Sequence, residues 1–211
     1  PYHAYLRDLL APIVTITLNN QSKGGSEAAE WVPGSALFEG RLGGAISGAD
    51  VIVFTLGGND LAHHFYDAGT DPISLIQALF QLPQLVQQVG DDLHTIAEAI
   101  HEQNPDASVV YMVYPNYAST EQWREATGAI YPLVQRGCAL CFNHMRASLA
   151  ELPYVTFADM LGALGWDAPL DGLLQDAWHP NQAGHALMAE EMFISLGGAR
   201  VGDEPLGLER G

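Results

Sequence analysis

The stretch Val51-Ile-Val-Phe-Thr-Leu-Gly-Gly-Asn-Asp60 decides the fold class, because an apolar run breaks abruptly into two glycines and two polar residues. A strand that is apolar on both faces is typical of a parallel sheet covered by helices. Further short apolar runs at residues 13–18, 108–114 and 154–157 also predict strands. Helical spacing separates these runs, and alternating strands and helices indicate βαβ units. We therefore expect an α/β fold with helices on both faces of a parallel sheet.

The expected helices come from apolar residues at helical spacing. They are placed at residues 2–10, from 72 with an interruption or restart at Pro83, at 85–101, at 131–152 and at 181–196. Ser26 is expected to cap a short helix that reaches Trp31. Residues 33–48 are expected to form a loop with at most one further helical turn. No repeat or linker is present, so residues 1–198 are predicted to form a single domain, with 199–211 as a C-terminal tail.

Charge and composition exclude several classes of partner. The chain has 211 residues, 48% of them apolar, and 25 acids against 8 lysines and arginines give a formal net charge of −17. Nucleic acids and anionic membrane surfaces are bound by basic patches, so neither is expected as a partner. No apolar run approaches the length of a membrane span, which predicts no integral membrane segment. The acidic balance slightly favours a secreted or periplasmic protein over a cytoplasmic one.

The cysteines give no metal site. Cys138 and Cys141 are the only two in the chain, and a structural zinc site needs four ligands. Their spacing falls in the middle of a predicted helix, where a redox pair is not expected. We interpret them as two small buried thiols, with a local disulfide as the alternative. His63 and His64 are adjacent, so their side chains should point apart and line a pocket rim or face solvent. No metal ion and no cofactor is expected.

The motif Asp176-Ala-Trp-His-Pro-Asn181, followed by Gly184-His185, carries the clearest chemistry. An acid three residues before a histidine can orient the imidazole and stabilise its protonated form, which leaves the second ring nitrogen free to move a proton. Asp176 and His179 are thus a candidate orienting acid and general base. The alternative is a simple helix entry, with the carboxylate near the N-terminal dipole. His185 is expected to be structural.

Two glycine-containing turns follow predicted strands, at residues 20–25 and 57–60. Either could be only a tight turn. In a parallel sheet, however, loops at the carboxyl ends of the strands share one edge and carry the site. Asn59 could then donate to a developing oxyanion from its side chain, and Gly25 from its backbone N–H. Asp60 is expected to brace its turn.

Together, these motifs resemble the SGNH (GDSL) hydrolase family. The resemblance rests on Gly-Gly-Asn-Asp after an apolar strand and on Asp-x-x-His-Pro-Asn-x-x-Gly-His before the last helix. It implies a flavodoxin-like three-layer α/β/α sandwich and hydrolysis of esters through a Ser-His-Asp triad. Carried onto this chain, it implies an oxyanion hole made by Gly25 and Asn59, with Gly24 as the alternative glycine. Asp176 and His179 become members of the triad.

One part of the family pattern is missing. The family's nucleophilic serine lies in a Gly-Asp-Ser motif at the end of the first strand, and this sequence contains no Gly-Asp-Ser. That first strand would lie at the middle of the sheet, between residues 13–18 and 51–56. We therefore expect the nucleophile and the central strand upstream of residue 1.

The predicted function is a serine esterase or lipase that acts on a small-molecule or lipid ester. The acyl or leaving group is expected to lie against the Phe65/Tyr66 region and Trp178. Two alternatives stay open. One is an SGNH-like domain that binds without catalysis, and the other is a carbohydrate O-acetyl esterase or acetyltransferase.

Overall fold

A three-stranded parallel sheet forms the centre of the protein. The structure is a computed structural model that describes residues 2–68 and 71–198. The strands are β1 (Val51–Phe54), β2 (Ser108–Val113) and β3 (Val155–Asp159), and they lie side by side in the order β1-β2-β3. Val53 pairs with Val110, and Val110 pairs with Thr156. The prediction of an α/β fold with a parallel sheet is confirmed.

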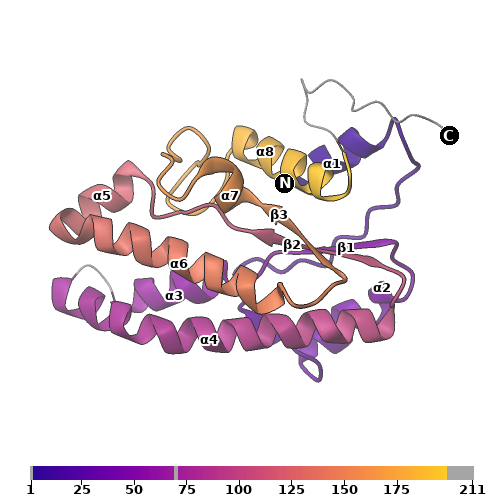
Figure 1. The fold of residues 1–211 in the computed structure, drawn as a ribbon, viewed down its shortest axis with the longest axis horizontal. Helices are drawn as coiled ribbons and strands as arrows, with labels where there is room; N and C mark the ends of the chain where they lie inside the picture. Colours follow the sequence, from indigo (N-terminus) through magenta and orange to yellow (C-terminus); the bar gives the residue numbers. More distant parts are fainter. Residues whose placement is uncertain (1, 69–70, 199–211) are drawn as a thin grey trace.

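Helices cover both faces of this sheet (Figure 1). On one face lie α1 (Tyr2–Leu10), α7 (Met160–Leu164) and α8 (Gln182–Ser195), and on the other lie α3 (Gly58–Ala68), α4 (Pro72–Gln103) and α6 (Tyr131–Leu149). Side chains alternate along a strand. Val110 and Met112 of β2 therefore pack toward α1 and α8, whereas Val109 and Tyr111 join the core beneath α4 and α6.

Shorter helical elements occupy the connections. They are η1 (Ala28–Trp31), η2 (Phe38–Leu42), α2 (Gly43–Ile46), α5 (Glu121–Thr127) and η3 (Gly128–Ile130). Residues 33–48 thus contain more helix than the predicted single turn. Ser26 is not the cap of the short helix: Glu27 holds that position, and its N–H donates to the Glu30 side chain at 3.0 Å. The Ser26 hydroxyl instead accepts a hydrogen bond from Trp31 Nε1 at 2.8 Å.

Helix α4 continues through Pro83, where an interruption was predicted. Proline removes one backbone hydrogen bond and normally kinks or ends a helix. Here Leu82 and Val86, on either side of Pro83, are buried in the same core, while Pro83 itself is exposed. Packing of one continuous apolar face outweighs the lost hydrogen bond.

Residues 13–18 do not form the predicted strand. They pair with no strand among the described residues, and Ile13, Val14 and Leu18 are exposed. β-Branched residues favour a strand only when a neighbouring strand supplies hydrogen bonds and side-chain contacts. Two strands of the sheet, β1 and β3, have a free edge, because each pairs with β2 alone among the described residues. β1 is therefore an edge strand, and its residues are exposed or partly exposed although its composition is typical of a strand covered on both faces.

The two cysteines lie on the inner side of α6. Cys138 and Cys141 are free and buried, as the thiol interpretation predicted, and they form no disulfide. Burial raises the pKa of each thiol to about 12. The predicted tail at 199–211 lies outside the described residues. In the described part of the chain, no helix is long and apolar enough to cross a membrane.

Candidate active site

Asp176 and His179 form a hydrogen-bonded pair in the loop before α8. His179 Nδ1 lies 2.8 Å from Asp176 Oδ2 and 3.0 Å from Oδ1. Asp176 Oδ1 also accepts the backbone N–H groups of Trp178 at 2.9 Å and of His179 at 2.8 Å. These bonds, with that from Trp178 the largest, lower the pKa of Asp176 and keep it ionised at neutral pH. The ionised Asp176 carboxylate keeps a proton on His179 Nδ1. Nε2 is then unprotonated and can accept a proton from a substrate or nucleophile.

The loop that carries this pair is closed on itself. Gln175 N–H donates to the carbonyl oxygen of His179 at 2.9 Å, next to a β-bridge between Leu174 and Pro180. Asn181 caps α8 by accepting the N–H of Gly184 at 3.1 Å. A Cβ on Gly184 would collide with the carbonyl oxygen of Leu173. The Asn-x-x-Gly part of the motif therefore builds the turn that presents His179.

His185, the last residue of the motif, lies on α8 and hydrogen-bonds to neither Asp176 nor His179 within the described residues. Its Nδ1 is buried without a hydrogen-bond partner in the same part of the chain. His185 is therefore not part of the hydrogen-bonded pair of Asp176 and His179.

The glycine pair after β1 makes the predicted turn, and this turn leads directly into a helix. Helix α3 begins at Gly58, so Asn59 and Asp60 lie in its first turn. Gly57 has φ +95°, a conformation that favours glycine, and a Cβ there would approach Met145 Sδ at 2.7 Å. A Cβ on Gly58 would lie 2.8 Å from Cζ of Tyr114. Both positions need glycine, because a larger residue would collide with the side chain of Met145 or Tyr114.

Two bonds tie the start of α3 to the segment after Gly25. Asn59 Nδ2 donates to the carbonyl oxygen of Ser26 at 2.8 Å. Both carboxylate oxygens of Asp60 accept the N–H of Ala28, at 3.1 and 3.2 Å. The structure thus brings together the two segments predicted to supply oxyanion donors, although 33 residues separate Asn59 from Ser26. We call this pair of bonds the loop clasp.

Two N–H donors near the loop clasp remain available. An amide nitrogen carries two hydrogens, and the bond to Ser26 uses one of those on Asn59. Gly25 has φ +76°, and no atom lies within 4 Å of the position that a Cβ would take. Its N–H has no acceptor among the described residues. The same space is open beside Gly24, which has no positive φ.

Asp60 is the buried acid of this region. Burial raises its pKa to about 6, and the hydrogen bond from Ala28 opposes that rise. The carboxyl group does brace the turn, as predicted, and its partner is the first residue of η1.

An aromatic cluster connects α3 to the loop that carries Asp176 and His179, which we call the dyad loop. The ring of Trp178 lies 5.9 Å from that of Tyr66 and 5.2 Å from that of Trp123, measured between centroids. Phe65 is buried and reaches the cluster through Trp123, at 6.0 Å. Tyr66 and Trp178, which were expected to line the substrate, therefore lie next to each other. Trp123 was missed because it lies on α5, far away in sequence from both.

The adjacent histidines on α3 point apart, as predicted. His63 Nδ1 lies 2.7 Å from Glu27 Oε1, and His64 Nε2 lies 3.0 Å from the carbonyl oxygen of Ala78. No group of three or more histidine, cysteine, aspartate or glutamate side chains in the described ranges could hold a metal ion.

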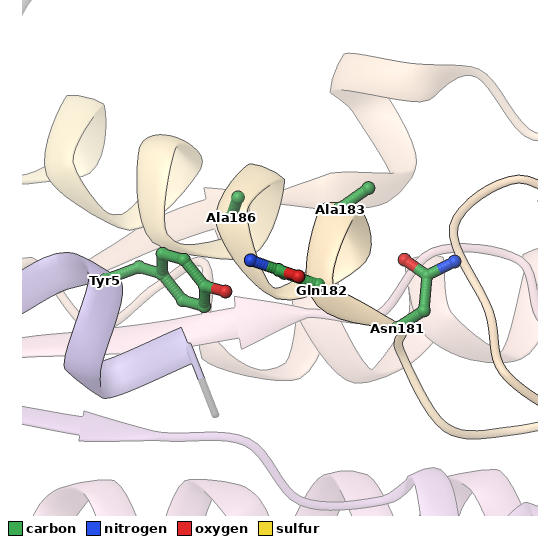
Figure 2. Close-up of a pocket in the computed structure, with 5 residues that line it drawn as sticks. All are labelled: Tyr5, Asn181, Gln182, Ala183 and Ala186. Atoms are coloured by element: carbon green, nitrogen blue, oxygen red, sulfur yellow. The ribbon is translucent and has the colours of Figure 1, made fainter.

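A surface depression of about 480 Å³ lies beside the site, between α1 and the start of α8. Figure 2 shows the Tyr5 hydroxyl directed toward Gln182, with Asn181 at the far end of the depression. Its lining residues do not include His179, Asp176 or Asn59. The depression therefore adjoins the loop that carries the dyad and does not contain the dyad.

Comparisons with known proteins support the fold. Solved structures with the same fold include a lipase from a goat rumen metagenome, which is 18% identical with a TM-score of 0.66 over 93% of this chain and 87% of that one. They also include an acetylxylan esterase from Geobacillus stearothermophilus, 17% identical with a TM-score of 0.61 over 96% and 84%. An extracellular lipase from Streptomyces rimosus is 18% identical, with a TM-score of 0.56 over 92% and 85%.

No curated protein matched the chain in sequence. The sequence model of the GDSL-like lipase/acylhydrolase family matches residues 1–187, which include every motif discussed above. This chain belongs to the GDSL-like lipase/acylhydrolase family.

Proposed function

We propose that the protein is a carboxylic ester hydrolase that works by acyl transfer through a Ser-His-Asp triad. The observation that carries the proposal is the pairing of His179 Nδ1 with an ionised Asp176, which leaves Nε2 without a partner among the described residues. Asp176 is the orienting acid and His179 the general base. The free N–H of Gly25 and the second amide hydrogen of Asn59 are the oxyanion donors.

The reaction proceeds in two steps, acylation of the serine and hydrolysis of the acyl-enzyme. A serine oxygen attacks the ester carbonyl, His179 takes the serine proton, and the alcohol leaves with that proton as the acyl–serine bond forms. Water then attacks the acyl-enzyme and gives a proton to His179. The carboxylic acid is released, and the proton returns to the serine.

The nucleophile is assigned to a segment outside the 211 residues. Ser26, the serine tied to the loop clasp, is buried, and its hydroxyl is bonded to Lys23 and Trp31. The unpaired edge of β1 and the exposed apolar side chains of Ile13, Val14 and Leu18 support a further strand in this sheet, and the family pattern places the serine at its end. Such a strand would satisfy the backbone groups on both sides, each of which costs about 1–3 kcal/mol when buried and unpaired.

The test is hydrolysis of a short p-nitrophenyl ester by the full-length protein. We expect His179→Ala to abolish it and His144→Ala, at an exposed position on α6, to leave it unchanged. A fluorophosphonate probe should label one serine in the wild-type protein. Full activity in folded His179→Ala would contradict the assigned base, and a protein that takes up no probe would be a non-catalytic binding domain.

A carbohydrate O-acetyl esterase is the second candidate. The exposed ring of Tyr66 beside Trp178 offers a flat apolar wall next to the dyad loop, and one structural neighbour is an acetylxylan esterase. Hydrolysis rates for p-nitrophenyl esters of increasing acyl length would decide between the candidates. Activity confined to acetyl esters favours the acetyl esterase, whereas activity that rises with chain length favours a lipase.

A further inference from the structure

The outer helical layer, α4 with α6, contains no acidic residue over residues 72–90 and 131–149, although the chain has 25. Residues 72–90 of α4 carry no charge of either sign. In a protein of net charge −17, a solvent-facing helix with this composition is unusual. The layer lies on the side of the sheet opposite α1 and α8 (Figure 1).

Large apolar side chains are exposed on this layer. On α4, Ile73 is 68% exposed, Ile76 is 40% exposed and Phe80 is 82% exposed. Their spacing of three and four residues places them along one side of the helix. Isolated exposed apolar residues are ordinary on protein surfaces, whereas a contiguous row indicates an interaction site.

Helix α6 extends this row. Leu133 and Leu140 are 56% and 61% exposed. They lie four residues before and three residues after Gly137, where a Cβ would contact the Leu79 side chain of α4 at 3.6 Å. The two leucines therefore lie on the side of α6 that borders α4. We define the uncharged face as Ile73, Ile76, Phe80, Leu133 and Leu140 with the exposed glutamines of the same stretch of α4, Gln77, Gln81 and Gln84.

We propose that the uncharged face is a self-association surface, where two copies of this chain meet around a twofold axis. A twofold interface places the same patch of each copy against the other. Two patches rich in acids would repel each other, but apolar groups pair with themselves, and an amide can both donate and accept. The residues of the uncharged face have this self-complementary chemistry, and the exposed Arg136 borders them on α6.

Charge also argues against a lipid surface as the occupant. Helices that lie on membranes usually carry lysine or arginine on their polar side, and residues 72–90 contain neither. The single cation between Leu133 and Leu140 is Arg136. The stretch from Ile73 to Gln84 spans about 17 Å of helix, and the exposed leucines of α6 widen the face beside it.

Sedimentation velocity of the full-length protein over a wide concentration range tests the proposal. We expect a reversible dimer that strengthens as salt is added, because screening weakens repulsion between the acidic remainder of the two copies. Phe80→Glu should weaken the dimer on the order of 30-fold, the scale of a central aromatic contact. Phe80→Gln should weaken it without adding charge. Gln103→Glu, at the far end of the same helix, adds the same charge outside the uncharged face and should have no effect.

The proposal is wrong if the protein stays monomeric at every concentration, or if both Phe80 variants leave the dimer intact. It is also wrong if the protein binds neutral phosphatidylcholine vesicles and Phe80→Gln abolishes that binding. Far-UV circular dichroism checks that each variant is folded. None of these measurements depends on ester hydrolysis, so the outcome is independent of the proposed function.

Discussion

Asn59 has two tasks in the proposed site, because one amide hydrogen bonds to Ser26 and the other is available to an oxyanion. In the full-length protein, Asn59→Ala should lower kcat on the order of 100- to 1000-fold, the effect of removing one oxyanion donor. KM should change little, because the donor acts mainly in the transition state. Steady-state hydrolysis of a p-nitrophenyl ester measures both constants. Asn143→Ala, at an exposed position on α6, is the control, and an unchanged kcat in folded Asn59→Ala would remove Asn59 from the site.

Asp60 should make stability depend on pH. Its pKa is raised to about 6, above an unfolded value of about 4, so the folded state keeps a proton that the unfolded state loses between these values. The contribution of this group to stability is therefore complete below pH 4 and is lost as the pH rises through 6. We expect the free energy of unfolding of wild type, relative to Asp60→Asn, to fall by about 3 kcal/mol over that window.

Urea unfolding of both proteins at several pH values between 4 and 7 measures this difference. The groups common to both proteins cancel in the comparison. A difference that does not vary with pH would show that Asp60 titrates normally.

At the scale of elements, the junction of β1 and α3 depends on Gly58. Alanine normally stabilises a helix relative to glycine, but a Cβ on Gly58 would lie 2.8 Å from the Tyr114 ring. That ring packs against Tyr117 and Phe142 and has little room to move. We expect Gly58→Ala to destabilise the protein by about 1–3 kcal/mol in thermal unfolding. Gly24→Ala, with no atom within 4 Å of the new Cβ, is the matched control, and equal stability of the two variants would contradict the steric argument.

Local patterns in the sequence were sufficient for much of the fold. β2 and β3 were predicted to within two residues, because each is a short apolar run between clear turns. The pairing of Asp176 with His179 was also predictable, since three residues of spacing bring the two side chains to one turn.

Predictions failed where a distant segment decides the outcome. Residues 13–18 have strand composition but no pairing partner in the described chain. The helix continues through Pro83 because Leu82 and Val86, on either side of it, are buried in the same core. The loop clasp joins residues 32 and 33 positions apart, and no local pattern encodes such a contact.

At the scale of the whole molecule, the net charge of −17 should set the response to salt. Like charges held at a compact surface repel, and the unfolded chain spreads them apart. We expect the melting temperature to rise as sodium chloride is added, with most of the gain at low ionic strength, where screening changes most. Neutralising an exposed acid, as in Glu125→Gln, should raise the melting temperature at low salt only. A melting temperature that falls with salt would contradict this account.

The buried thiols of α6 give the molecule a built-in reporter of its own opening. With a pKa of about 12, Cys138 and Cys141 hold almost no thiolate at neutral pH while they stay in the core. A thiol reagent in solution can then react only when α6 detaches and the sulfurs regain an ordinary pKa. The rate of alkylation under native conditions therefore measures how often this helix leaves the sheet, a local free energy that no global melting experiment provides.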